Sequence, residues 1–386
     1  MDKDHLRLVS AIALNAIFGN EPRIAARIVE TFGSAEEIFS LTEQERTEIF
    51  GPWSKFSSRL GPASLDAAHK EFLDLSARGI NFISIFDTDT YPPLLRECPD
   101  APLLLYVRGD PSVLLNRHPV SIVGTRDMDS YGRDWCVKAV RALTEAPDKP
   151  LIVSGLAFGV DITAHLAALS CGLPTVAVIP VGIERIYPAS HSVAAGKIIA
   201  AGGAVITDYP PGTVPLPYNF LRRNRIIAGM SAATLLVESR RKGGGMMTAR
   251  LASGYGRTVL ALPGRVDDPR SAGCNALIAE KVAEAFTGPE ALSEACGLGR
   301  PASRPAPKAE DALRERFSGR LNDNQIQSLT RVFTTIREHR GIRPDQLAET
   351  LDMDYSAASR AICLLESEGF ICTDVLQRCS TNVNFA

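Results

Sequence analysis

Residues 151–165 read LIVSGLAFGVDITAH, and this stretch decides the fold. The apolar run 151–153 is followed by a small loop with two glycines and then by 160–165, which has the composition of a helix. A buried strand that turns through glycines into a helix is the repeating unit of parallel α/β sheets. If this unit builds the fold, it must recur along the chain.

Apolar segments of strand length do recur, and each is followed by a segment of helical composition. They are 120–123, 175–179, 204–207, 234–237 and 258–262. Because these segments are apolar throughout, helices should cover both faces of the sheet. The sequence therefore predicts an α/β core with an extended, Rossmann-like, doubly wound parallel sheet. Ligands of such sheets bind at the carboxyl ends of the strands, so functional residues are expected directly after each strand.

The chain before this core has a different composition. Residues 1–79 have helical apolar spacing, and a turn near 19–23 separates the expected helices 6–18 and 24–32. This pattern is typical of a small helical domain with a helix-hairpin-helix. An alternating stretch at 80–85 then predicts the first strand, so we place the domain boundary near Gly79.

The chain after the core also changes composition. The core is expected to span 80–296, and 297–311, rich in Pro, Gly and basic residues, is expected to be a linker. Residues 312–386 predict a separate module, in which two helices and a following strand form a helix-turn-helix with a wing. The second helix, 356–366, carries a single arginine, so we expect the module to contact protein or itself rather than DNA.

Composition narrows the functional class. No apolar run reaches the roughly 20 residues of a membrane helix, and the first residues, MDKDH, lack the features of a signal peptide, so a cytoplasmic protein without membrane contact is expected. The eight cysteines form no CxxC pair, which favours reduced, buried thiols over disulfides or zinc ligands. No metal and no cofactor are expected. The cysteines are Cys98, Cys136, Cys171, Cys274, Cys296, Cys363, Cys372 and Cys379.

Charge is distributed unevenly. The net charge is only −2, but residues 218–257 hold eight Lys and Arg against the single acidic residue Glu238. A solvated basic face is the ordinary explanation of such a run. Here two aromatic residues and a glycine loop accompany it, which favours a site that follows a nucleic-acid backbone and stacks bases.

The candidate DNA-binding residues follow the strands or lie in this basic region. Gly124-Thr125-Arg126 ends the strand 120–123, where free N–H groups and a guanidinium suit a phosphate, although an ordinary turn with an incidental Arg is an equal alternative. The run 243–248 is expected to begin a helix that can bind an anion. The full set is Gly124, Thr125, Arg126, Ser154, Gly155, Gly159, Phe220, Arg222, Arg223, Asn224, Arg225, Arg240, Arg241, Lys242, Gly243, Gly244 and Thr248.

Signs of catalysis are weak. Asp161 and His165 share a helical face and could form an acid/base pair, but a capping Asp beside a hydrogen-bonded His explains them more simply, and no nucleophile accompanies them. The chain has no G-x-G-x-x-G dinucleotide fingerprint, no GxxxxGK[ST], no GxSxG and no HExxH. No catalytic residues are predicted.

Five motifs in order resemble one family. They are GTR at 124–126, SGLAFGVDITAH at 154–165, IYP at 186–188, FLRRNRIIAGMS at 220–231 and ALPG at 261–264. Together they resemble the DprA (Smf) family of bacterial DNA-processing proteins. The resemblance implies a homodimer without catalytic activity that binds single-stranded DNA on a Rossmann core and loads the recombinase RecA during natural transformation and recombination. It also implies a SAM-like N-terminal domain and a C-terminal winged helix.

The resemblance transfers roles to particular residues. Arg126 matches the arginine of the family's Gly-Ser-Arg motif, with Thr125 in place of Ser, and Arg223-Asn224-Arg225 match an RNR triplet. Two departures are Phe158, where many relatives have a basic residue, and Gly243 to Met247, which replace a Ser-Gly-Ser pattern. We therefore expect DNA contacts to shift toward Arg222, Arg240 and Arg241.

Two other functions remain open at this stage. A nucleotide phosphoribohydrolase could use a similar core with a PGGxGTxxE motif, but GGGMMTARLA at 243–252 has no Glu after its Thr. An interaction scaffold could dock basic partners on its acidic end domains. The clustering of arginines near 222–225 is the feature that argues against a scaffold.

Overall fold

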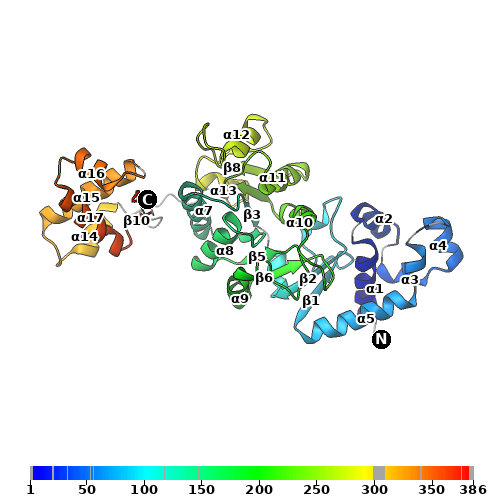
Figure 1. The fold of residues 1–386 in the computed structure, drawn as a ribbon. Coiled ribbons are helices and arrows are strands. Elements are labelled where there is room, and N and C mark those ends of the chain that lie inside the picture. The colour runs from blue at the N-terminus through cyan, green and yellow to red at the C-terminus, as the bar shows by residue number, and fades with distance from the viewer. Residues whose placement is uncertain are drawn as a thin grey trace. The chain divides into compact units, whose positions relative to one another are not determined.

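The computed structural model describes residues 3–19, 21–32, 34–52, 54, 56–116, 118–146, 148–298, 309–339, 341–374 and 376–381. The chain divides into two compact units, 1–301 and 302–386. Figure 1 shows the elements of both. Most of the predicted linker at 297–311, and Asn20 in the predicted hairpin, lie outside the described residues.

A nine-stranded sheet is the centre of the first unit. The strand order is β1-β2-β6-β5-β4-β3-β7-β8-β9, and every pair from β6 to β9 is parallel. The strands are β1 (Ile80–Ser84), β2 (Leu104–Gly109), β3 (Pro119–Val123), β4 (Leu151–Ser154), β5 (Thr175–Val178), β6 (Ala204–Thr207), β7 (Ala233–Leu236), β8 (Thr258–Ala261) and β9 (Glu284–Ala285).

The prediction of a purely parallel sheet is wrong at one edge. Strand β2, which sequence analysis did not predict, pairs antiparallel with β6, and β1 pairs antiparallel with β2. The connection between β1 and β2 holds only a four-residue helix, Pro93–Arg96, in place of the full helix that usually makes a parallel crossover, and the chain folds back as an antiparallel pair. The core is therefore a mixed sheet that is largely parallel.

The two faces of the sheet belong to different hydrophobic clusters. Val120 and Ile122 of β3 pack in one cluster, and Val123 packs in the other, because alternate side chains of a strand point to opposite faces. Helices α7 (Ser130–Ala142), α8 (Val160–Ser170) and α13 (Pro289–Ala295) contribute to the first cluster. Helices α9 (Ser192–Ala200), α10 (Pro217–Met230), α11 (Gly244–Gly254) and α12 (Ala272–Ala279) contribute to the second.

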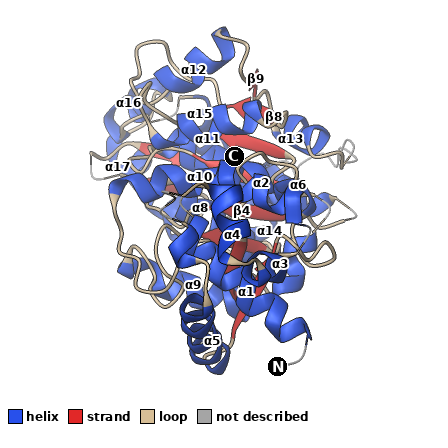
Figure 2. Cartoon of the chain, turned by 90° about the vertical axis from the view of Figure 1, so that its right-hand side faces the viewer, coloured by secondary structure: helices blue, strands red, loops and turns tan. Residues whose placement is uncertain are grey.

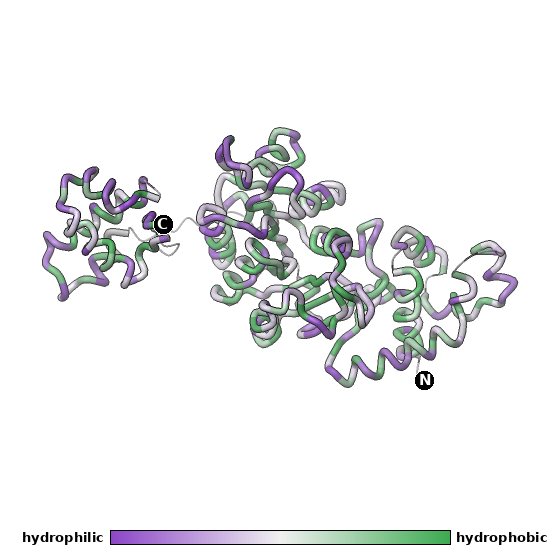
Figure 3. Tube along the Cα trace, viewed as in Figure 1, coloured by the Kyte–Doolittle hydropathy of each residue, from purple (hydrophilic) through white to green (hydrophobic). Residues whose placement is uncertain are grey.

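The predicted double winding is thus present. Figure 2 shows strands among helices, and in Figure 3 hydrophobic residues gather along the central strands. Strand order changes direction at β3, since β4, β5 and β6 follow on one side of it and β7 and β8 on the other. The loops after β3 and β7 therefore diverge, and a crevice is expected between them.

The N-terminal helices share a core with the sheet. Val9, Ile12 and Leu14 belong to the same hydrophobic cluster as the strand residues Leu105 and Ile206. Asn15 also donates a hydrogen bond to the backbone oxygen of Asp208, at 3.1 Å. The helices are α1 (Lys3–Phe18), α2 (Pro22–Phe32), α3 (Ala35–Ser40), α4 (Glu43–Phe50), α5 (Pro62–Ala77) and α6 (Pro93–Arg96), the last of which lies between β1 and β2.

The second unit is a small helical module with a hairpin. Its helices are α14 (Ala309–Phe317), α15 (Asp323–Glu338), α16 (Pro344–Thr350) and α17 (Tyr355–Ser367), and β10 (Ile371–Thr373) pairs antiparallel with β11 (Cys379–Thr381). Its core includes Phe333, Leu365 and Phe370. Glu368 accepts from Arg316 and Arg320, both at 2.7 Å, so two of its basic side chains are paired within the unit.

The cysteines and the apolar helices can be compared with the expectations from composition. The eight cysteines, all among the described residues, form no disulfide, but Cys363 and Cys372 are exposed, so the prediction of buried thiols is wrong for these two. Cys363 is on the outer face of α17 and Cys372 is on a short hairpin strand, where alternate residues face solvent. Among the described residues, no helix is both long and apolar enough to cross a membrane.

Candidate nucleic-acid interface

A cleft of about 580 Å³ lies at the carboxyl ends of β3 and β7. Its walls come from the loops after these strands, from the loop after β4, and from the first turns of α10 and α11. Its charged lining residues are the basic Arg126, Arg223, Arg240 and Lys242 and one acidic residue, Asp161. The cleft therefore has a positive excess in the crevice where sheets of this kind bind ligands.

The backbone of the loop after β3 is held by contacts with neighbouring segments, whereas the side chain of Arg126 is exposed. The N–H of Thr125 donates to the backbone oxygen of Glu238 at 2.7 Å, and a Cβ on Gly124 would lie 2.5 Å from Val160 Cγ2. The side chain of Arg126 is exposed, and its guanidinium carbon lies 5.1 Å from the centre of the Phe220 ring. The loop thus holds the Arg126 guanidinium beside the Phe220 ring, and the contacts of Gly124 and Thr125 restrict movement of its backbone.

The glycine loop begins helix α11, as the sequence predicts. Gly243 is the N-cap and the helix runs from Gly244 to Gly254. The first N–H groups of a helix have no acceptor within it, and the helix dipole is positive there, so this end can bind an anion. Gly243 and Gly244 line the cleft together with the exposed side chains of Arg240 and Lys242. Phosphate oxygens are the anions that this arrangement suits best.

Arg223 lies at the floor of the cleft and is buried. Its Nη1 donates to the backbone oxygen of Val178 at 2.6 Å, and burial lowers the pKa of the guanidinium to about 10. The same burial raises the pKa of the neighbouring Asp161 carboxyl, while the charge of Arg223 opposes that rise. A Cβ on Gly155 would lie 1.9 Å from Nη1, which explains why glycine is required there. Asn224 also lines the cleft and contacts the α11 backbone.

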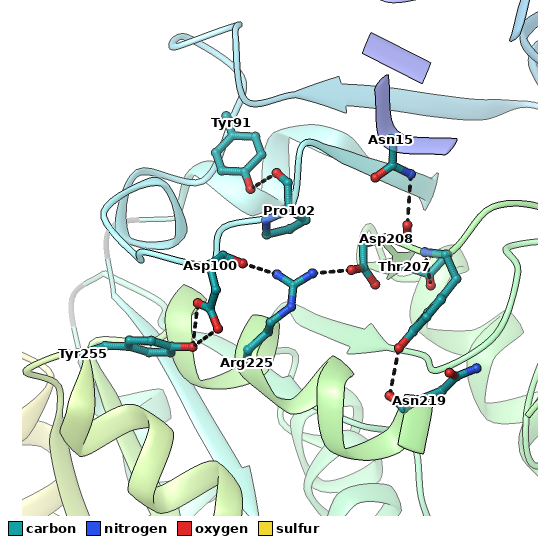
Figure 4. Close-up of polar contacts among 10 residues, drawn as sticks. Asn15, Tyr91, Asp100, Pro102, Thr207, Asp208, Asn219, Arg225 and Tyr255 are labelled. Carbon is teal, nitrogen blue, oxygen red and sulfur yellow. Dashed lines mark hydrogen bonds and ion pairs between the residues drawn. The ribbon is translucent and has the colours of Figure 1, made fainter. Parts of the chain in front are cut away.

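Arg225 does not line the cleft. Its guanidinium is 5% exposed and forms an ion pair with the buried Asp208. It also donates to the backbone oxygen of Asp100, whose carboxylate accepts from the Tyr255 hydroxyl at 2.7 and 2.8 Å (Figure 4). The network reaches α1 through the Asn15 bond to Asp208. This arginine joins the N-terminal helices, the segment before β2 and the sheet.

The difference between these arginines comes from helix α10. This helix begins at Pro217, five residues before the first arginine of the basic run. Residues 223–225 are therefore inside it, and all three are buried. Arg222 is half-buried, and its guanidinium carbon lies 5.9 Å from the Tyr209 ring centre. Proline at the first helical position and the following apolar residues are the signals that could have located this start.

Some of the remaining predicted residues line the cleft, and others pack against the loops that form it. Ser154 is buried and donates to the backbone oxygen of Ile122 at 2.6 Å, and Gly159, with φ +73°, leaves no space for a Cβ beside the oxygen of Thr125. Arg241 is exposed but does not line the cleft. The predicted residues that do line it are Gly124, Thr125, Arg126, Phe220, Arg223, Asn224, Arg240, Lys242, Gly243, Gly244 and Thr248.

Several cleft residues were not predicted. Tyr187, in the IYP motif, packs against Phe220 with ring centres 5.4 Å apart, and Leu221 and Ser239 line the walls. The signal for Tyr187 was an aromatic residue before a proline in a loop after a strand. Asp161 and His165 do not form an acid/base pair among the described contacts. The Asp161 carboxylate accepts from the Ala157 N–H, and His165 Nδ1 contacts the Thr175 hydroxyl at 2.7 Å.

The carboxyl group of Glu238 is buried next to the loops that form the cleft. Glu238, 2% exposed, follows β7 and accepts from the N–H of Asp129 at 3.3 Å. Burial and the Asp129 carboxyl raise the pKa of Glu238 to about 8. Asp129 is the N-cap of α7, since its side chain accepts from the Gly132 N–H.

The fold and the cleft define a Rossmann-type α/β protein with a basic crevice at the point where strand order reverses. Residues 81–297 match the family model described as DNA recombination-mediator protein A, and the chain belongs to this family. The match covers more than half of the chain, including every strand from β2 to β9.

Relatives agree with this assignment. Protein Smf of Escherichia coli is 38% identical over 213 residues, which are 54% of this chain and 54% of that protein. The DNA processing protein DprA of Streptococcus pneumoniae is 37% identical over 232 residues, 60% of this chain and 78% of that protein. The chain thus matches about half the length of the E. coli relative.

A solved structure gives the same result. The X-ray structure of DprA from S. pneumoniae covers 67% of this chain and 94% of its own, with a TM-score of 0.53 and 31% identity. A DNA processing protein A from Helicobacter pylori, whose structure concerns a single-stranded DNA binding mode, covers 56% and 94% with a TM-score of 0.49 and 29% identity.

Proposed function

We propose that this protein binds single-stranded DNA in the cleft after β3 and β7 and delivers the strand to a recombinase. The observation that carries the proposal is the pairing, in one cleft, of a helix N-terminus flanked by Arg240 and Lys242 with the Arg126–Phe220 stack. The first arrangement suits a phosphate and the second suits a base. A strand that has lost its pairing offers both groups to the protein.

The phosphate end is the better defined of the two. The Thr125–Glu238 bond fixes the β3 loop, and Gly245 packs against it, since a Cβ on Gly245 would lie 3.1 Å from Gly124 Cα. Rigid N–H groups with nearby cations bind phosphate without a large loss of conformational entropy. This end gives affinity that depends on salt and does not depend on base sequence.

The aromatic end favours single strands over duplex. A base stacked on Phe220 must be unpaired and turned out of a helix, which a duplex allows only at the cost of breaking pairs. The guanidinium of Arg126 beside that ring adds a cation contact to the stack. We therefore assign DNA contact to Arg126, Phe220, Arg240, Lys242 and Gly244, and a structural role to Arg225.

The finer parts of the proposal rest on the family. Its description as a recombination mediator supports RecA recombinase as the partner, natural transformation and recombination as the process, and the cytoplasm as the location. We propose a homodimer on the same ground. The five helices before β1 suggest a SAM-like domain, 1–79, and the order α16, α17, β10, β11 suggests a winged helix within 312–386. The linker is proposed at 297–311.

The experiment is a titration of fluorescent single- and double-stranded oligonucleotides at two salt concentrations. Wild type is compared with Arg126→Ala and with Arg141→Ala, whose exposed side chain is in the last turn of α7, at the other end of that helix. We expect a strong single-strand preference that falls with salt and with loss of Arg126, and no change for Arg141→Ala. Equal affinity for duplex, or an Arg126→Ala variant with unchanged affinity, would overturn the proposal.

A further inference from the structure

A second, smaller hollow adjoins the cleft beyond Arg126. It has a volume of about 30 Å³ and is lined by Arg126, Gly155, Ala157, Phe158, Tyr187, Pro188 and Phe220. Arg126, Ala157, Tyr187 and Phe220 border both hollows, so the two lie side by side. Phe158 borders only the smaller one, and its side chain is 50% exposed.

The Phe158 ring is held rigidly although it is exposed. Its ring centre lies 4.7 Å from that of His191, with the planes at 65°, and His191 is itself buried and bonded to the backbone oxygen of Leu156 at 2.7 Å. Leu156 and Gly159, on either side of Phe158, both have positive φ, +57° and +73°. The loop that carries the ring thus has two residues in the left-handed region of backbone conformation.

The Phe158 loop is also fixed to the Arg126 loop. The Val160 N–H donates to the oxygen of Thr125 at 3.2 Å, and a Cβ on Gly159 would lie 2.3 Å from the same oxygen. The two loops are therefore packed against each other, which places the exposed ring beside the Arg126–Phe220 stack. A rigid aromatic face beside a cation is the arrangement on which nucleic-acid bases stack.

We propose that Phe158, together with Tyr187, which also lines the hollow, is a stacking site for one unpaired nucleobase of a strand whose phosphates lie in the main cleft. A space of about 30 Å³ is too small to enclose a base, so the base lies on the ring faces with its hydrogen-bonding edge outward. The site therefore accepts any base. This inference rests on the proposed function and adds to it a contact that does not depend on charge.

The charge independence gives a distinctive test. Loss of a phosphate contact lowers the slope of log affinity against log salt concentration, whereas loss of a stacking contact lowers affinity equally at all salt concentrations. We would measure the affinity of full-length wild type, Phe158→Ala and Phe158→Tyr for an oligothymidine and for a strand of the same length in which every base is removed. Leu166→Ala, an exposed apolar residue of α8 outside the hollow, is the matched control.

For the oligothymidine, Phe158→Ala should bind about 5- to 100-fold more weakly with an unchanged salt slope, because each stacked base contributes that order of affinity. Phe158→Tyr should retain wild-type affinity, as should Leu166→Ala. On the abasic strand, wild type and Phe158→Ala should bind equally. Unchanged melting temperatures would show that the exposed ring is not needed for folding.

The outcomes separate this inference from the proposed function. If Phe158→Ala binds oligothymidine like wild type while Arg126→Ala binds more weakly, the stacking site is overturned and the cleft remains the DNA site. If wild type does not prefer single strands, the proposed function itself fails. If Phe158→Ala changes sedimentation of the protein alone and weakens binding to both strands equally, the ring is a protein contact and the inference is overturned.

Discussion

Arg126 at the mouth of the cleft and Arg225 beneath it show how burial divides the work of one residue type. Both belong to motifs whose resemblance implied DNA contact. Arg126 is exposed and faces Phe220, whereas Arg225 is 5% exposed and forms an ion pair with Asp208. An exposed guanidinium can exchange water for phosphate, but a buried one is already committed to a carboxylate that would otherwise be buried without its charge partner.

The arginines of α10 show that the role of a basic residue depends on which side of its helix it occupies, and therefore on whether it is buried. Arg222, Arg223 and Arg225 are near neighbours in sequence but occupy different sides of α10. One lies near the surface, one forms the cleft floor, and one holds the N-terminal part of the unit on the sheet. Substitutions in the two regions should therefore have different effects on stability and on DNA binding.

Replacing Arg225 by Ala should lower the free energy of unfolding by about 3–5 kcal/mol, because it leaves Asp208 as an uncompensated buried charge. Chemical denaturation measures this loss. Arg250→Ala is the control, since its pair with Glu280 is about half exposed on both sides and should contribute less than about 1 kcal/mol. Equal, small losses for the two variants would break the comparison.

Gly155→Ala tests the packing of Arg223, the buried arginine that forms the floor of the cleft. The added Cβ would lie 1.9 Å from Nη1, so the buried guanidinium must move away from the Val178 oxygen. We expect a loss of about 1–3 kcal/mol in unfolding free energy, together with weaker DNA binding. Gly196→Ala in α9 has nothing within 4 Å of its Cβ and should be neutral or slightly stabilising. If both substitutions are equally tolerated, the cleft floor is not packed as described.

Glu238→Gln contrasts with Arg225→Ala, because Glu238 is a buried carboxyl whose neighbour is another carboxyl. Its pKa is raised from the usual 4.5 to about 8, so the folded state holds a proton that the unfolded state releases between these values. Wild-type stability should therefore fall as pH rises from about 5 to 8, and the variant should lose less, by at least about 1 kcal/mol. Thermal melts across this range measure the difference. Parallel pH profiles for the two proteins would refute the assignment.

Lys242→Ala should have the smallest effect on stability and a clear effect on binding. Lys242 lines the cleft, while the neighbouring Arg241 is equally exposed but does not. Loss of one phosphate contact should reduce the magnitude of the single-strand salt slope by about 0.7 for Lys242→Ala, with a smaller change for Arg241→Ala. Fluorescence titration over a range of salt concentrations gives both slopes. A larger change for Arg241→Ala would indicate that the DNA strand contacts Arg241 rather than Lys242.

Much of the core could be predicted because parallel strands are apolar along their whole length. Six predicted strands are present as β3 to β8, each within a residue or two of its expected bounds. Strand β2 was missed, although Leu104 and Leu105 are fully buried, because a proline-rich segment precedes it and no crossover helix follows. An antiparallel edge pair has no such recurring pattern around it.

The cleft could be predicted only in part. Glycine loops after strands located Gly124–Arg126 and Gly243–Gly244, because the fold dictates that strand ends meet there. Burial of Arg225 could not be predicted, since its partner Asp208 belongs to another strand end and Asp100 to a distant loop. The outward ring of Phe158 depends likewise on His191, which is distant in sequence.

The central claim is that the strand lies in the cleft and does not touch Arg225. Photo-crosslinking of the wild-type protein to an oligonucleotide with 5-iodouracil, followed by mass spectrometry of the linked peptides, tests this without any variant. The account predicts crosslinks within 124–126, 158, 187, 218–221 and 240–248. Crosslinks confined to the Arg225–Asp208–Asp100 region, or to the unit 302–386, would contradict it.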